Sequence, residues 1–320
     1  MVLTVTLNAA VDRTYRIEGF ALDRVHRPTE SRVVAGGKGV NVARVVCALG
    51  GEALATGFLG GYHGRFVERS LNEEGIAHDF VRTRGESRLC IAVVDPVSGT
   101  QTEVNENGPT VSRAEVSRLE RRFVALLERV RPDWVVLAGS VPPGAPDDIY
   151  ARLIGLANRE KVRSVLDASG AALRNGVAAR PWMVKPNRAE MGQLFGAPPR
   201  TVDEAAERCS RLIEYGIAVA LGTLGREGAV LVCSSGAWYA EPPAVEFVSA
   251  VGSGDALVAA TLWALGQGQT LTEALRLGVA AGAANAMVCG AGYCTAEQVH
   301  SLAPAVAVRG LVAGRRVGVG

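Results

Sequence analysis

The chain has 320 residues, of which 48% are hydrophobic, and its 34 Lys and Arg against 32 Asp and Glu give a formal net charge of +2. Because the basic residues are scattered instead of gathered in runs, we expect neither a nucleic acid nor a membrane as a partner. This length and apolar content can bury one large core, which predicts a single main domain, residues 1–320, with a small attachment.

The first segment, residues 1–10, is apolar but too short to span a bilayer, and Asp12 and Arg13 follow it directly. We therefore interpret it as a buried first strand. The six cysteines lie within or beside apolar stretches and show no CxxC spacing. Reduced thiols of this kind are typical of cytoplasmic proteins, so the cytoplasm is the expected location.

Apolar runs typical of buried parallel strands recur along the chain. They lie at 2–7, 53–58, 134–138, 164–167, 183–185, 217–221 and 229–233. Helical patterns lie between or after them, at 40–49, 113–130, 147–158, 201–215, 254–265 and 271–288. Because strand and helix alternate, the sequence predicts an α/β fold with a doubly wound, mostly parallel sheet flanked by helices.

Two pairs of short segments with alternating polarity interrupt this rhythm. Residues 15–18 pair with 30–34, and residues 88–95 pair with 101–105 through a turn. They predict a small side sheet, and we expect a lid formed by about 13–35 and 87–108 to cover a ligand at the carboxyl ends of the main strands. The tail, residues 308–320, is expected to be loosely ordered.

Two places near the start of the chain carry polar residues suited to a ligand. One lies just after the first strand, and the other is the motif Gly-Gly-Lys-Gly-Val-Asn at 36–41. Asn8 and Asp12 lie just past the first strand, and an ionised Asp12 can hold two sugar hydroxyls because it offers only hydrogen-bond acceptors. Gly37, Lys38 and Asn41 combine close backbone approach with polar groups, which suits a polyhydroxylated or anionic ligand. The alternatives are a turn-forming Asp and a glycine-rich turn with a solvated lysine.

Two further strand ends carry polar groups. Residues 185–190 end a strand and open a helix, with Asn187 as the cap and Glu190 three residues later. Such a capping box is compatible with Glu190 also holding a hydrated Mg²⁺ beside nucleotide phosphates. Residues 221–229 end a strand in glycines and a hydroxyl, which fits a phosphate or ribose contact or, alternatively, an ordinary hairpin turn.

The strongest local signal is Gly-Ser-Gly-Asp at 252–255, followed at once by an apolar helix. The backbone N–H groups of Gly252, Ser253 and Gly254 and the helix N-terminus form a space for phosphate oxygens. Asp255 at this anion-binding end makes chemical sense as a base that accepts a hydroxyl proton. Taken alone, the motif is also explained by a helix N-cap with turn glycines.

In this order the motifs resemble the pfkB (ribokinase-like) carbohydrate kinase family, in its phosphofructokinase and tagatose-6-phosphate kinase branch. The resemblance covers nearly the whole chain. Its motifs lie at 4–8, 36–41, 139–144, 167–170, 185–187 and 252–255. It implies a ribokinase-like kinase domain with a β-sheet lid, the use of ATP and Mg²⁺, and a homodimer joined through the lids.

The resemblance also implies a role for each matching residue. Asp255 is expected to be the catalytic base and the backbone of Gly252, Ser253 and Gly254 the anion hole. The expected sugar-binding residues are Asp12, Gly37, Lys38 and Asn41, with Arg27 and Arg88 facing the substrate's own phosphate. The nucleotide and metal side is expected to consist of Lys185, Asn187, Glu190, Thr223, Gly225, Gly228 and Asn285.

The expected reaction is transfer of a phosphoryl group from ATP to a hydroxyl of a ketohexose phosphate, of the tagatose-6-phosphate kinase or 1-phosphofructokinase type. Two departures from the branch, Ala9 in place of Pro and Ser253 in place of Ala, are small and do not affect this mechanism. The alternatives are a 6-phosphofructokinase or another sugar or nucleoside kinase of the family. A catalytically silent sugar- or nucleotide-binding regulator is the alternative outside the enzymes.

Overall fold

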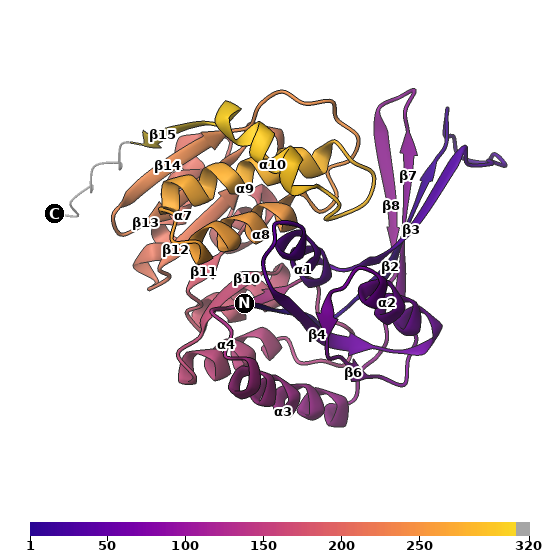
Figure 1. The fold of residues 1–320 in the computed structure, drawn as a ribbon, viewed down its shortest axis with the longest axis horizontal. Helices are drawn as coiled ribbons and strands as arrows, with labels where there is room; N and C mark the ends of the chain where they lie inside the picture. Colours follow the sequence, from indigo (N-terminus) through magenta and orange to yellow (C-terminus); the bar gives the residue numbers. More distant parts are fainter. Residues whose placement is uncertain (312–320) are drawn as a thin grey trace.

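The computed structural model describes residues 1–311, which form a large mixed sheet, a small second sheet and helices around both (Figure 1). The order of the large sheet is β15-β14-β13-β12-β11-β10-β9-β1-β4-β5, with β6 also paired to β4. The seven strands from β12 to β5 in this order run parallel, and β13, β14 and β15 add an antiparallel edge. Its strands are β1 (Val2–Thr6), β4 (Ala53–Leu59), β5 (Ala77–His78), β6 (Val81–Arg82), β9 (Trp134–Ala138), β10 (Arg163–Asp167), β11 (Met183–Val184), β12 (Val219–Thr223), β13 (Ala229–Cys233), β14 (Gly236–Glu241) and β15 (Ala307–Leu311). The predicted α/β fold is confirmed.

Helices cover both faces of the large sheet. They are α1 (Lys38–Ala48), α2 (Gly61–Glu73), α3 (Arg113–Val130), α4 (Ile149–Arg159), α5 (Gly170–Ala178), α6 (Arg188–Phe195), α7 (Val202–Glu214), α8 (Ser253–Gly266), α9 (Leu271–Ala286) and α10 (Ala296–Leu302), with short 3₁₀ turns η1 (Gly225–Glu227) and η2 (Ala303–Ala305). Successive side chains of a strand point to opposite faces of the sheet. Val136 belongs to the core on the face that α1, α8 and α9 cover, and Val135 belongs to the core on the face that α3 to α7 cover. The near-continuous apolar runs of the sequence follow from this burial on both sides.

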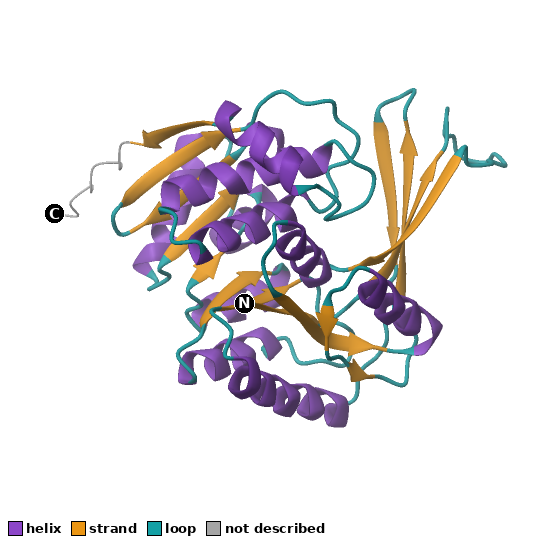
Figure 2. Ribbon diagram, viewed as in Figure 1, coloured by secondary structure: helices purple, strands orange, loops and turns teal. Residues whose placement is uncertain are grey.

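The small sheet projects from one end of the molecule (Figure 2). It has the order β3-β2-β7-β8, with β2 (Ala10–Arg16), β3 (Glu30–Gly36), β7 (Arg88–Asp95) and β8 (Thr100–Asn105). The two predicted strand pairs are confirmed as antiparallel neighbours. The first strand of the small sheet was predicted at 15–18, and this position was wrong. The strand begins at Ala10, soon after β1, because Ala10 already pairs with Gly36 of β3. Asp12 consequently lies inside β2 and not in a turn.

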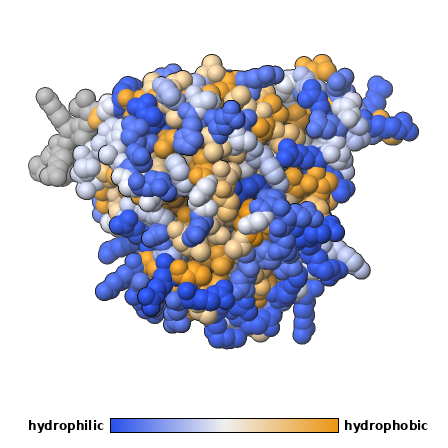
Figure 3. Space-filling model, in the orientation of Figure 1, coloured by the Kyte–Doolittle hydropathy of each residue, from blue (hydrophilic) through white to orange (hydrophobic). Residues whose placement is uncertain are grey.

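The last part of the described chain also corrects an expectation. Residues 307–311 form an edge strand that pairs with β14, although the tail from 308 was expected to be loosely ordered. The rest of that predicted tail, 312–320, lies outside the described residues. Within residues 1–311, no helix is long and apolar enough to cross a membrane. The face seen in Figure 3 is mainly hydrophilic, with hydrophobic patches between the polar side chains.

Gly57 in β4 provides a test of the strand packing beside the site. Its φ is 140°, and a Cβ there would lie 1.9 Å from the carbonyl oxygen of Thr6 in the neighbouring β1. We expect Gly57→Ala to lower the free energy of unfolding by about 2–4 kcal/mol, through backbone strain and displacement of β1, as measured by chemical denaturation. Gly155→Ala in α4, where a Cβ meets nothing within 4 Å, is the control and should be neutral or slightly stabilising. Equal stability of the two variants would contradict this account.

Candidate active site

Polar groups gather at the carboxyl ends of the central parallel strands, where ligands bind in open α/β sheets. Asn8 follows β1, Ser140 follows β9, Asp167 ends β10 and Lys185 follows β11. Lys38 joins them from the first residue of α1. These residues are distant in sequence and converge because their strands are parallel neighbours.

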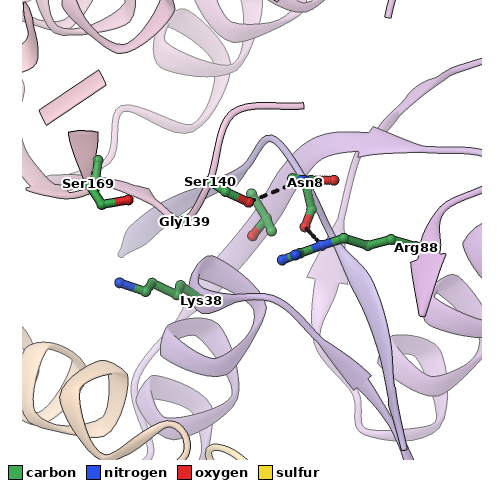
Figure 4. Close-up of a pocket in the computed structure, with 8 residues that line it drawn as sticks. Asn8, Lys38, Arg88, Gly139, Ser140 and Ser169 are labelled. Atoms are coloured by element: carbon green, nitrogen blue, oxygen red, sulfur yellow. Dashed lines mark hydrogen bonds between the residues drawn. The ribbon is translucent and has the colours of Figure 1, made fainter. Parts of the chain in front are cut away.

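A cavity of about 230 Å³ opens at this edge of the sheet, where it meets the small sheet (Figure 4). Lys38 from α1 and Arg88 from β7 both line it, so that two cations face one space. The Nδ2 of Asn8 donates to Ser140 Oγ at 3.0 Å, and its buried Oδ1 has no partner among the described residues. The cavity therefore offers two cations and side-chain hydroxyls to a polar, anionic ligand.

Asp255 lies in the first turn of α8 and is only 5% exposed. Its Oδ2 accepts a hydrogen bond of 2.8 Å from Asn41 Nδ2 on α1, which brings the Gly-Ser-Gly-Asp motif against the Gly-Gly-Lys-Gly motif. Burial raises the pKa of Asp255 to about 7, although Lys38 and the Asn41 hydrogen bond oppose the rise. A carboxylate that titrates near neutral pH is suited to accept a proton.

Lys38 connects Asp255 to the opposite wall of the site. Its Nζ lies 2.7 Å from Asp167 Oδ1 and 4.0 Å from Glu190 Oε1, while Lys185 Nζ lies 3.2 Å from Asp167 Oδ2. Burial disfavours the charged form of Lys38, but Asp167, Asp255 and Glu190 together raise its pKa well above the ordinary value. Two lysines likewise hold the pKa of Asp167 below its ordinary value despite complete burial. Lys38 thus remains charged where an anionic ligand would sit.

Asp12 lies on β2, between Val34 of β3 and Cys90 of β7. Burial raises its pKa to about 6, against the opposing charges of Arg88 and Arg44. Gly36 makes room for it, since a Cβ at that position would lie 2.1 Å from Asp12 Oδ2. The structure therefore places this carboxylate close to Arg88 on the small sheet, above the main strands.

The predicted anion hole sits at the start of α8, where Gly252 adopts a φ of 81°. The Ser253 N–H donates to Ala250 O at 3.2 Å, whereas Gly254 belongs to the first helical turn, whose N–H groups lack intrahelical acceptors. Asn285 is fully buried and ties this loop together, with Nδ2 donating to Val251 O at 2.8 Å and Oδ1 accepting from Gly292 N at 2.7 Å. The predicted contact of Asn285 with the nucleotide stays a prediction.

The predicted nucleotide side forms around the start of α6. Asn187 and Glu190 make the capping box that the sequence predicts, with bonds of 2.8 and 2.9 Å between each side chain and the other's N–H. Thr223 at the end of β12 bridges to Asn187, and Gly225 and Gly228 bound the following 3₁₀ turn. These residues therefore lie together at the carboxyl ends of β11 and β12. Arg88 lines the cavity on the other side of Lys185.

The donor set around Glu190 fits Mg²⁺. Among residues 1–311 no group of three or more His, Cys, Asp or Glu side chains is arranged to hold a metal ion. Mg²⁺ is usually held by one or two carboxylates together with phosphates and water, so a single buried carboxylate suffices. Burial raises the pKa of Glu190, and one of its oxygens faces Lys38 instead of a backbone N–H.

The two predicted arginines differ in position. Arg88 points toward Asn8 (Figure 4), with Nε donating to Asn8 O at 3.0 Å and Nη1 to Glu106 O at 3.3 Å. Arg27 is exposed on the loop between β2 and β3 and does not line the cavity of this chain. Its contact with the substrate's phosphate stays a prediction. Gly37 is the N-cap of α1, and a Cβ there would lie 2.7 Å from Thr6 Cγ2 and 3.2 Å from Ala9 Cα.

Sequence reasoning gave no role to Ser140 or Asp167, although both lie in its motifs at 139–144 and 167–170, and it named Asn8 only as a neighbour of Asp12. Ser140 and Asn8 line the cavity, and Asp167 holds both lysines. The same signal that identified Asp12 was available for them, since each is a polar residue at the carboxyl end of a predicted strand.

Comparison with known proteins decides the family. The model for pfkB family carbohydrate kinases matches residues 5–298, which is most of the chain. The chain belongs to this family. It is therefore an ATP-dependent carbohydrate kinase, and the predicted ribokinase-like fold and family resemblance are confirmed.

Relatives and solved structures agree with this assignment. The chain is 34% identical to the 1-phosphofructokinase of Bacillus subtilis (strain 168), over 96% of this chain and 99% of the relative. It is 33% identical to a tagatose-6-phosphate kinase of Staphylococcus epidermidis, over 94% and 97% of the two chains. The structure of phosphofructokinase-2 from Escherichia coli in complex with substrates and products superposes with a TM-score of 0.88, at 28% identity and covering 95% and 98%.

Proposed function

We propose that this pfkB family kinase transfers the γ-phosphoryl group of ATP to a primary hydroxyl of a ketohexose phosphate. The observation that carries the proposal is the contact of Asp255 with the Gly-Gly-Lys-Gly helix, 2.8 Å from Asn41 and next to the cavity that Lys38 and Arg88 line. Two cations thus line this space, and the base lies beside it, close to Lys38. The names of the relatives, 1-phosphofructokinase and tagatose-6-phosphate kinase, support this substrate class.

In the proposed mechanism Asp255 accepts the proton of the attacking sugar hydroxyl. The sugar is held by Asp12, Asn41 and the backbone at Gly37, which places the hydroxyl in line with the γ-phosphorus. Lys38 and the N–H groups of Gly252 and Gly254 at the start of α8 offset the charge on the moving phosphoryl group. The N–H of Ser253, between them, would have to leave Ala250 O to join them. Most of the acceleration then comes from positioning and electrostatics.

The nucleotide would lie along the edge formed by Lys185, Asn187, Thr223, Gly225 and Gly228, with Asn285 behind the loop. Glu190 would hold Mg²⁺, which neutralises phosphate charge when bound with ATP. Lys185 fits the phosphate end of this edge, since its Nζ would be 3.6 Å from a Cβ at Gly254.

The small sheet acts in this proposal as the lid of a single kinase domain, with Arg27 and Arg88 directed at the substrate's own phosphate. Closure over the cavity would exclude water that competes with the sugar for the phosphoryl group.

The lid also joins two copies of the chain into a homodimer in this proposal. Leu22, Val25 and Val104 are large apolar residues exposed on the lid, and a second copy would cover them. A protein of this kind works in the cytoplasm, on a small-molecule sugar phosphate.

A coupled assay of ADP release tests the proposal. The purified protein would be offered ATP and Mg²⁺ with fructose 1-phosphate, fructose 6-phosphate, tagatose 6-phosphate or the free sugars. We expect ADP release with fructose 1-phosphate or tagatose 6-phosphate and little with the free sugars, because these lack a phosphate for Arg88. ADP release with free sugars alone would exclude a phosphorylated substrate, and none with any sugar would favour a binding protein.

The pH dependence of kcat/KM provides a prediction about the free enzyme. The base must be ionised, so the active fraction falls as pH drops through the Asp255 pKa of about 7. Between pH 8 and pH 6 we expect kcat/KM for the sugar phosphate to fall about tenfold, and more steeply below the Asp12 pKa of about 6. The measured profile is corrected for ionisation of the substrate's phosphate, near pH 6. A flat corrected profile from pH 8 to pH 6 would contradict the role of Asp255.

A further inference from the structure

Arg44 on α1 is a buried arginine, 5% exposed, whose guanidinium contacts four separate parts of the chain. Nη1 donates to Asn41 Oδ1 at 3.2 Å and to Ala291 O at 3.0 Å, and Nη2 donates to Ala35 O at 2.8 Å and to Glu74 Oε1 at 3.2 Å. Nε donates to Glu74 Oε2 at 2.6 Å. All five N–H donors of the side chain are therefore occupied, and its position is fixed.

The contact with Asn41 determines which way that amide points. A guanidinium has donors only, so the atom of Asn41 beside Arg44 has to be the oxygen. The Nδ2 group is then turned to the other side, where it donates to Asp255 Oδ2 at 2.8 Å. Arg44 thus acts two hydrogen bonds away from the proposed base, without touching the cavity.

The surroundings of Arg44 are built to hold it. Tyr293 lies over the guanidinium, 4.4 Å from ring centroid to Cζ, and its hydroxyl donates to Glu74 Oε1 at 3.0 Å. Arg32 of β3 lies 4.3 Å from the same ring. The cluster of Arg32, Arg44, Glu74 and Tyr293 therefore connects the small sheet, α1 and the loop after α9.

We propose that Arg44 is a positioning residue for phosphoryl transfer, which acts through Asn41 by holding the amide so that its Nδ2 donates to Asp255. This inference rests on the proposed function of Asp255 as the base. The consequence is a carboxylate with one oxygen fixed by Asn41 and the other left for the sugar hydroxyl.

The electrostatic setting predicts the direction of the effect when the amide is released. Lys38 of α1, Asp167 at the end of β10 and Lys185 after β11 are the charged groups that act on Asp255, with both lysines lowering its pKa and Asp167 raising it. The hydrogen bond from Asn41 also lowers this pKa. Loss of that bond therefore raises it, by about one pH unit for a hydrogen bond to a charged group.

The test uses Arg44→Lys, which keeps the positive charge but cannot supply the two-pronged donor geometry. We expect kcat to fall roughly 10- to 100-fold, as for a misplaced catalytic group, with KM for both substrates changed less than about threefold. The matched control is Arg69→Lys on α2, an exposed arginine 4.0 Å from Glu73, which should leave kcat unchanged. In an Asn41→Ala background, Arg44→Lys should have no further effect on kcat.

A second readout does not depend on turnover. The Asp255 carboxyl carbon is followed by NMR in protein with ¹³C-labelled aspartate and is assigned by its loss in Asp255→Asn. Its titration should move up by about one pH unit in Arg44→Lys and should not move further in the Asn41→Ala background. If Arg44→Lys does not fold, Glu74→Gln, which loosens Arg44 from the other side, should cause a smaller shift in the same direction.

Two results would overturn the proposal. One is a loss of stability in Arg44→Lys while kcat and the Asp255 titration stay unchanged, which would mean a purely structural role. The other is an equally large effect in the Asn41→Ala background, because Arg44 would then not act through Asn41. Failure of the proposed function looks different: no sugar would be phosphorylated by the wild-type protein, while the titration of Asp255 would still respond to Arg44→Lys.

Discussion

Asp255→Asn is expected to lower kcat by about two to four orders of magnitude, with little change in KM for either substrate, as for loss of a positioned general base. The asparagine keeps the size of the side chain and removes its ability to accept a proton. Nothing else in the first turn of α8 replaces this group, because Gly254 and Ser253 offer no carboxylate. Steady-state kinetics with saturating ATP measures the effect.

Asp203→Asn is the matched control, since Asp203 is an exposed acid in the first turn of α7, outside the site. It shares the helix-terminal environment of Asp255 and should leave kcat within about twofold. Near-normal turnover of the Asp255 variant would remove this residue from the role of base and with it the proposed mechanism.

Arg88→Ala is expected to raise KM for the phosphorylated sugar roughly 10- to 100-fold, which is the usual range for loss of a charge-assisted hydrogen bond. The same substitution should change KM for ATP less than about threefold. The Nε and Nη1 groups of Arg88 bind Asn8 O and Glu106 O, which fixes the guanidinium at the cavity wall. In the proposed function, its Nη2 group binds the substrate's phosphate. Initial-rate measurements in which each substrate is varied in turn separate the two KM values.

Arg16→Ala tests whether the effect comes merely from lost charge on the small sheet. Arg16 is an exposed residue at the end of β2, away from the cavity, and its removal should leave both KM values unchanged. If Arg88→Ala raised KM for ATP as much as KM for the sugar phosphate, Arg88 would only shape the lid. The same would follow if a sugar without phosphate were affected equally.

Elements with a strong local pattern were predicted closely, and weak patterns were missed. The apolar run of β9 and the amphipathic α3 coincide with their predicted ranges, because each is buried in a regular way along its own length. The helix α2 was not predicted, since its three buried residues, Gly64, Val67 and Leu71, give little apolar signal. The position of β2 depends on pairing with β3 and β7, which short-range polarity does not encode.

The candidate site shows the same division. Sequence motifs identified Asp255, Lys38 and Asn41, because glycine-rich turns and polar strand ends are local features. Asp167, by contrast, was noticed only within a motif of the family. Its importance arises from Lys38 and Lys185, which approach it from α1 and from the strand next to β10.

The sequence by itself determined the family, the alternation of strand and helix, and the identity of the proposed base. Only the tertiary structure decided how these parts act on one another. Asn41 and Asp255 are 214 positions apart and meet because α1 and α8 cover the same face of the sheet. Burial raises the pKa of Asp255 to about 7, although the hydrogen bond from Asn41 opposes the rise, and Arg44 fixes the amide of Asn41. The physical reason is that burial and charge act through space, at distances that packing sets and sequence separation does not.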